Sequence, residues 1–138
     1  MYLLDTNVLS ELRKIRKNQA NQGVINWLKT TQPHELYTSV IVMIELERWV
    51  LLKARKDPIQ GKLLNEWYRA IQQHFQGRIV MIDEHIASVC ASLHVPNPKP
   101  EHDALIAATA IARNWILVTR NIKDFQGIPH IQLLNPFE

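Results

Sequence analysis

The feature that most constrains the fold is an alternation of short apolar runs with longer segments of helical periodicity. The apolar runs occupy residues 2–4, 36–38, 79–82, 115–118 and 130–134. Each is too short for a helix, and between them apolar residues return every three or four positions. Strands that alternate with helices usually pair in parallel, so we expect an α/β fold with a central, mostly parallel sheet flanked by helices.

Caps and breakers delimit the helical segments. Ser39 is the predicted N-cap of a helix from 40 to about 53, and Asp83 is that of a helix through Leu93. Gly77 is the predicted stop after the helical pattern of 58–75, and the prolines at 96, 98 and 100 predict a loop. Further helices are predicted from Thr6 or Asn7, around 24–28, and over 104–112, where the uninterrupted apolar sequence indicates burial.

Length and composition favour one soluble domain over residues 1–138. The chain is 46% hydrophobic but has no apolar run near the roughly 20 residues of a membrane span, and its start lacks a basic segment before an apolar one. Its single cysteine, Cys90, suits a reducing cytoplasm. A net charge of +3 is compatible with a polyanionic partner without indicating one.

Asp5 directly follows the first apolar run, at the carboxyl end of the predicted strand. Open parallel sheets bind their ligands at such ends, which makes the Asp5 carboxylate a candidate for chemistry. The alternative is that Asp5 only caps the helix that follows, a role in which its oxygen accepts a backbone N–H. The sequence leaves both interpretations open.

Glu45 lies on the apolar stripe of its helix, in register with Val42 and Trp49. A carboxylate that faces the interior must be paired, hydrogen-bonded or bound to a metal. The alternative is an ion pair with Arg48 at the edge of the stripe. Glu47, one step further round, is expected to face solvent.

Asp103 begins the buried helical segment 104–112, where backbone N–H groups and the helix dipole are expected to lower its pKa. The preceding His102 is either a ligand or base, or a residue of the rim. Thr119, Asn121 and Asp124 follow the fourth strand. If right-handed crossovers bring these positions to one edge with Asp5 and Glu45, the carboxylates repel unless Mg²⁺ or Mn²⁺ binds them, and such a site hydrolyses phosphodiesters.

A basic cluster follows the first helix, formed by Arg13, Lys14, Arg16 and Lys17. It is a candidate for binding RNA phosphates near Asp5. The alternative is a solvated helix end, which is common for a run this short.

The segments 3–11, 39–46, 103–110, 118–121 and 133–136 together resemble the PIN domain, in particular the VapC-type toxins of bacterial toxin–antitoxin modules. The resemblance spans nearly the whole chain and implies a three-layer fold and a homodimeric, Mg²⁺- or Mn²⁺-dependent endoribonuclease. It implies metal ligands at Asp5, Glu45 and Asp103, with Asn7, Thr119 and Asn121 adjacent. Many members carry an acid where this chain has Asn121, so Asp124 is the predicted fourth carboxylate.

The resemblance also implies a cognate antitoxin. A cationic side chain of that partner is expected to enter the carboxylate cluster, and helix grooves beside Trp27 or Trp49 are expected to receive an amphipathic helix.

Two alternatives remain. One is a PIN-like module that binds RNA or protein without catalysis, which the departure at Asn121 keeps open. The other is a phospho-acceptor receiver or a haloacid-dehalogenase-type phosphatase. It fits poorly, because the receiver needs acids on different early strands and the phosphatase needs a second Asp where Asn7 stands.

Overall fold

The computed structural model describes all residues, 1–138, and contains one five-stranded sheet with the order β3-β2-β1-β4-β5. Every neighbouring pair of strands is parallel, which confirms the predicted α/β fold. The strands are β1 (Tyr2–Leu4), β2 (Leu36–Ser39), β3 (Ile79–Val80), β4 (Ile116–Val118) and β5 (Gln132–Leu134).

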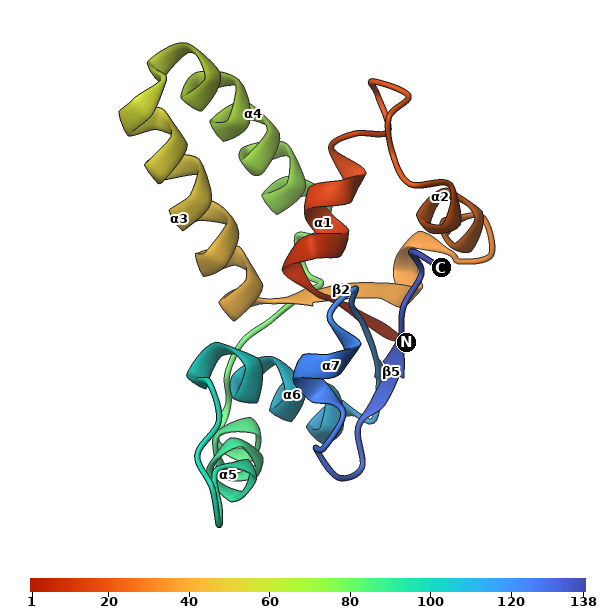
Figure 1. Ribbon diagram of the computed structural model, residues 1–138, viewed down its shortest axis with the longest axis vertical. Coiled ribbons are helices and arrows are strands. Elements are labelled where there is room, and N and C mark those ends of the chain that lie inside the picture. The colour runs from red at the N-terminus through yellow and green to blue at the C-terminus, as the bar shows by residue number, and fades with distance from the viewer.

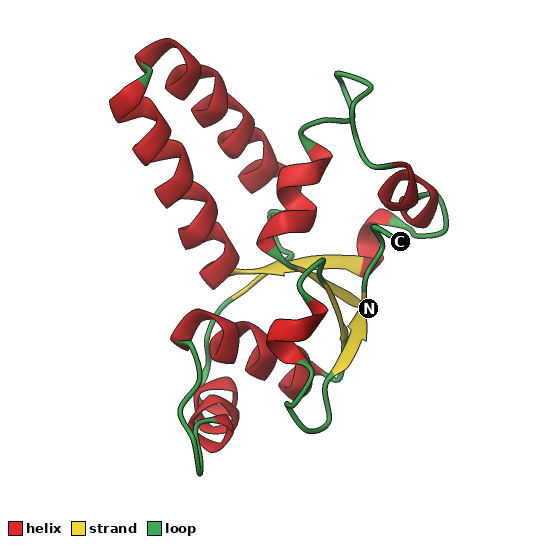
Figure 2. Ribbon diagram, viewed as in Figure 1, coloured by secondary structure: helices red, strands yellow, loops and turns green.

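Helices cover the sheet on both sides, which gives the three expected layers (Figures 1 and 2). Their bounds are α1 (Thr6–Leu12), α2 (Gln22–Leu28), α3 (Val40–Lys56), α4 (Pro58–His74), α5 (Glu84–Leu93), α6 (Glu101–Arg113) and α7 (Ile122–Phe125), with a 3₁₀ turn at Pro33–Glu35. The α3–α4 hairpin and α1 lie on one side of the sheet, and α5, α6 and α7 lie on the other (Figure 1). None of the helices has the length and apolarity to cross a membrane.

Strand order explains where a ligand site forms. From β1 the chain adds β2 and then β3 toward one edge, and it then returns to add β4 and β5 on the opposite side of β1. Right-handed crossovers place the helices of the two halves on opposite faces of the sheet. The order therefore reverses between β1 and β4, and the crevice for a ligand opens at their carboxyl ends.

The core holds the central strands between helices of both layers. Leu3, Leu4 and Leu117 of the sheet are fully buried, as are Val42 of α3 and Ala107 of α6. The α3–α4 hairpin closes tightly because Gly61 lies against Ala54, where a side chain on Gly61 would overlap the neighbouring helix. These contacts fix the helices from which the polar side chains of the crevice project.

Several predicted bounds were wrong. The third strand ends at Val80 rather than residue 82, because β2 ends at Ser39, which pairs with Val80 and caps α3. The last strand begins at Gln132, since His130 has a φ of 67° that no strand accommodates. Helix α6 begins at Glu101 rather than residue 104, and α3 continues to Lys56.

Candidate active site

Asp5 stands at the point where the order of strands reverses. Its Oδ1 accepts the backbone N–H of Thr6 across 2.8 Å, and its Oδ2 accepts the hydroxyl of Thr119 across 2.7 Å. The residue is only 6% exposed. Asp5 therefore caps α1, as one interpretation of the sequence predicts, and it also presents a carboxylate to the crevice, where its part in chemistry stays a prediction.

Thr119 joins the ends of the two strands that flank the crevice. Besides donating to Asp5, its Oγ1 accepts the side-chain amide of Asn7 at 3.3 Å and the backbone N–H of Asn121 at 3.0 Å. One donor and two lone pairs are all that a hydroxyl offers, so every one is used. Asn7 in turn accepts the backbone N–H of Arg120 at 3.0 Å. This network holds the turn after β1 against the turn after β4.

Glu45 reaches the same region from α3. Its Oε2 accepts the hydroxyl of Thr6 across 2.6 Å, and its Oε1 lies 3.2 Å from Nδ1 of His102. These partners take the place of the Arg48 ion pair weighed from the sequence. Glu47 points elsewhere, since it pairs with Arg69 at 3.0 Å. The two oxygens of Glu45 are thus held by residues of two different elements, α1 and α6.

Asp103 and Asp124 line one cavity beside this network, Asp103 from the first turn of α6 and Asp124 from α7. The pKa of Asp103 is raised from its ordinary value, by burial first and then by the negative charges of Asp124 and Glu45. The prediction that the helix dipole would lower this pKa was wrong. No hydrogen bond to the Asp103 carboxylate offsets its desolvation, so burial and like charge prevail.

The pKa of Asp5 is also raised. Burial is the main cause, and the carboxylates of Glu45 and Asp103 add to it, while the hydrogen bonds from Thr119 and Thr6 oppose it. Asp5, Glu45 and Asp103 therefore interact with one another, and Asp103 interacts with Asp124. These four residues, the carboxylate cluster, form one electrostatically coupled group.

The donor set of the carboxylate cluster suits a hard divalent cation. Mg²⁺ and Mn²⁺ prefer carboxylate oxygens. Burial, and after it the charge of neighbouring carboxylates, raises the pKa values of Asp5 and Asp103. Among the neighbours that act on Asp103, His102 is the one that lowers its pKa. A divalent cation would relieve the repulsion between these carboxylates and offset the desolvation of their charges.

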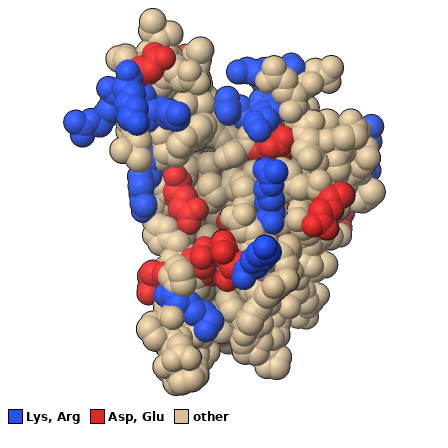
Figure 3. All heavy atoms as spheres, in the orientation of Figure 1, with Lys and Arg blue, Asp and Glu red and all other residues tan.

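Acidic side chains gather near the middle of the face in Figure 3, with basic side chains on both sides of them. The predicted RNA-binding cluster begins at the other end of α1 from Asp5. There Lys14 pairs with Glu11 at 3.2 Å, and the guanidinium of Arg13 stacks on Trp49. Arg16 lines a groove between α1 and α4. The structure thus separates these cations from the carboxylates by the length of the helix.

The sequence gives no sign of one partner of the carboxylates, Thr6, and leaves the role of a second, His102, open. Thr6 carries no charge or periodic signal, and its hydroxyl matters only because α3 passes close to α1. His102 was weighed as a ligand, base or rim residue, and it contacts Glu45 from α6. Its position just before Asp103 was the only sequence signal.

Comparison with known proteins places the chain in a defined group. The PIN domain family model matches residues 2–130. The toxin FitB of Neisseria gonorrhoeae is 33% identical to this chain, with 99% of each chain covered. The crystal structure of FitAcB from the same organism superposes with a TM-score of 0.86 at 30% identity, covering 100% of this chain and 99% of that one. The VapC ribonuclease Y4jK of Sinorhizobium fredii is 29% identical over 100% of this chain and 99% of its own. A toxin–antitoxin complex from Klebsiella pneumoniae superposes with a TM-score of 0.70 at 27% identity, covering 100% of this chain and 99% of that one.

Proposed function

This chain belongs to the PIN-domain family, alongside the FitB and VapC toxins, and from that premise we propose that it is a divalent-metal-dependent endoribonuclease acting as the toxin of a toxin–antitoxin pair. The observation that carries the proposal is the carboxylate cluster at the reversal of strand order. One relative that matches along the whole chain is named a VapC ribonuclease, which supports this class of reaction.

Asp5, Glu45, Asp103 and Asp124 would hold Mg²⁺ or Mn²⁺. When bound, such a cation lowers the pKa of water and stabilises the charge that develops on a phosphodiester under attack. The chain itself supplies orientation. Thr119 and Thr6 fix the oxygens of Asp5 and Glu45 before any ligand arrives, so little reorganisation is needed on binding.

Asp124, rather than Asn121, is the proposed fourth carboxylate. Asp124 lines the cavity that also contains Asp103, and its charge raises the pKa of Asp103. Asn121 has another task, since its backbone N–H donates to Thr119 at the start of α7.

An antitoxin is the proposed partner, supported by the toxin–antitoxin complex that shares this fold. A groove between α1 and α4 is lined by apolar side chains that include Leu12, Leu63 and Trp67. It lies beside Trp49, which meets Trp67 edge to face with centroids 6.4 Å apart. This groove is the proposed seat of an amphipathic helix, whereas Trp27 packs on Tyr2 instead.

The deciding experiment measures cleavage of single-stranded RNA by purified protein with Mg²⁺, with Mn²⁺ and with EDTA. Cleavage should require the metal and fall by several orders of magnitude in Asp5→Asn, Asp103→Asn and Glu45→Gln. Glu47→Gln is the matched control, because Glu47 lies on the same helix but pairs with Arg69. Undiminished cleavage in the first three variants would place the reaction elsewhere.

The second candidate, a PIN-like binding module without catalysis, is favoured by one observation, the amide of Asn121 in place of a carboxylate. The same assay distinguishes it, because a binding module retains RNA without metal-dependent cleavage. Expression without an antitoxin should arrest growth only for the ribonuclease. The homodimer implied by the resemblance stays a prediction, which sedimentation of the purified protein tests.

A further inference from the structure

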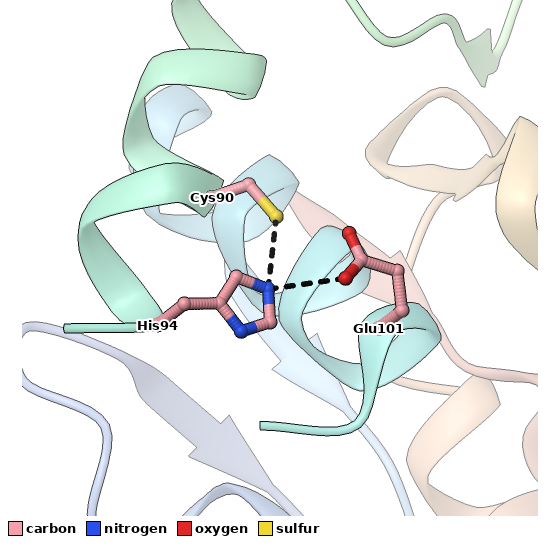
Figure 4. Close-up of side chains that lie close together, drawn as sticks. All are labelled: Cys90, His94 and Glu101. Carbon is pink, nitrogen blue, oxygen red and sulfur yellow. Dashed lines mark hydrogen bonds and ion pairs between the residues drawn. The ribbon is translucent and has the colours of Figure 1, made fainter. Parts of the chain in front are cut away.

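His94 ties together three segments that precede Asp103 along the chain. It follows the last turn of α5, and its Nε2 lies 3.9 Å from Sγ of Cys90 and 3.4 Å from Oε2 of Glu101, the first residue of α6 (Figure 4). Its Nδ1 accepts the backbone N–H of Lys99 across 3.0 Å. One imidazole ring therefore holds α5, the loop 95–100 and the start of α6 in fixed relation.

Cys90, His94 and Glu101 are residue types that bind zinc, but the hydrogen bond from Lys99 fixes the tautomer against it. Because Nδ1 accepts a backbone proton, its lone pair is occupied and the ring proton resides on Nε2. An Nε2 that carries a proton faces Cys90 and Glu101 as a donor and has no lone pair for a metal. Cys90, His94 and Glu101, here called the clamp, therefore hold the loop 95–100 in place rather than a metal ion.

The residue that the clamp holds is Lys99. Its side chain is half-buried and lines the cavity that also contains Asp103 and Asp124. It is the only cationic residue of that lining, and it forms an ion pair with neither acid. The Lys99 side chain thus lines the same cavity as two proposed metal ligands, held there through its backbone and paired with neither of them.

We propose that Lys99 binds a phosphate of the RNA strand next to the one that is cleaved, and that His94 is the positioning residue that holds Lys99 at the cavity. This proposal rests on the proposed ribonuclease function. A phosphodiester strand that crosses the carboxylate cluster brings further negative charges to it, and a cation at the edge of the cavity attracts the neighbouring phosphate. Because the loop is already fixed, less conformational entropy is lost when the contact forms.

The first test measures the affinity of a single-stranded RNA oligonucleotide for the Asp5→Asn protein with Mg²⁺ at several salt concentrations. Each phosphate contact in a single strand contributes about 0.7 to the slope of log K against log salt, so Lys99→Ala should reduce the slope by about that amount. Lys62→Ala is the control for charge, since Lys62 is exposed on α4, far along the chain from the site. It should leave the slope unchanged.

The second test separates positioning from folding. In the wild-type background, Lys99→Ala and His94→Leu should each raise KM about tenfold with little change in kcat. A tenfold rise in KM corresponds to the loss of one hydrogen bond to a charged group. His94→Asn should restore KM, because its Oδ1 can accept the Lys99 N–H in place of Nδ1. The KM of the double variant should be no higher than that of Lys99→Ala, since both substitutions remove the same contact between Lys99 and the phosphate.

Three outcomes would overturn the proposal. They are an unchanged salt slope in Lys99→Ala, a His94→Leu protein with normal KM, and Zn²⁺ binding to the wild-type chain that Cys90→Ala abolishes. Absence of cleavage with a slope that still depends on Lys99 would refute the ribonuclease function and support the phosphate contact. Normal cleavage with an unchanged slope would refute only the contact.

Discussion

The hydroxyl of Thr119 donates its only proton to Oδ2 of Asp5 across 2.7 Å, although 114 positions separate the two residues. The bond crosses the gap between the ends of β1 and β4. It opposes the rise in the Asp5 pKa that burial causes. A neutral hydroxyl thereby helps to keep the most buried carboxylate of the cluster ionised and ready for a cation.

Replacing Thr119 by Val should therefore shift the pH dependence of cleavage. Without the hydroxyl the pKa of Asp5 rises further, so the rise of cleavage with pH should move to higher pH, while Thr119→Ser should retain the wild-type profile. Stability should fall by about 1–3 kcal/mol, because Asn7 and Asn121 lose their acceptor. A pH–rate profile and urea unfolding measure the two effects.

Thr109→Val is the control for this substitution. Thr109 is equally buried, but its hydroxyl donates to the carbonyl of Leu105 within α6. Its replacement should leave the pH profile unchanged. An equal shift in both variants would assign the effect to general repacking.

Asp103→Asn should stabilise the metal-free protein at neutral pH. The pKa of Asp103 is raised in the fold, so its contribution to stability is lost as pH rises above the unfolded value of 3.8 and through the folded pKa. The gain in Tm of the variant with EDTA should accordingly vanish as the pH falls below about 3.8, where the Asp103 carboxyl of the wild-type protein is neutral in both the folded and the unfolded state. Saturating Mg²⁺ should reverse the order, because the cation stabilises only the wild-type site.

Asp5→Asn should not give the same gain. Both oxygens of Asp5 accept hydrogen bonds, one from the Thr6 N–H and one from the Thr119 hydroxyl, so an amide nitrogen in Asn would have to face one of these donors. The melting temperature of Asp5→Asn with EDTA should lie below that of Asp103→Asn. The opposite order would show that repulsion outweighs the hydrogen bonds at Asp5.

Asp124→Asn should weaken metal affinity more than Asn121→Ala does. The former removes a charge that acts on Asp103, whereas the latter leaves the backbone N–H that donates to Thr119 in place. Titration with Mn²⁺, followed by calorimetry, ranks the two variants. A larger loss in Asn121→Ala would assign the fourth position to Asn121.

Leu63→Glu should release the toxin from its antitoxin without altering RNA cleavage. Leu63 is 62% exposed and lines the groove between α1 and α4, so a charge there should repel an apolar helix at little cost to the fold. Ile59→Glu is the matched control on α4, because Ile59 is more exposed and lies outside the groove. Equal inhibition of both variants by the antitoxin would place its helix elsewhere.

The fold and the carboxylates followed from the sequence because they depend on local signals. Short apolar runs predict strands, and an acid directly after such a run, as at Asp5, marks the carboxyl end of its strand. Glu45 is recognisable because it interrupts the apolar stripe of a helix. The pKa of Asp103 did not follow, since it depends on Asp124 and Glu45, which only the tertiary fold brings near. The roles of Thr6 and His94 were equally invisible, because each depends on contacts that the spacing of residues does not encode.

The position of β4 has a consequence for the newly made chain. β1 lies at the centre of the sheet, yet one of its two neighbours, β4, pairs Ile116 with Tyr2 and follows it by more than a hundred residues. Until β4 docks, Asp5 lacks Thr119 and the cavity lacks Asp124. The site is therefore complete only after the chain has closed the sheet on both sides of β1.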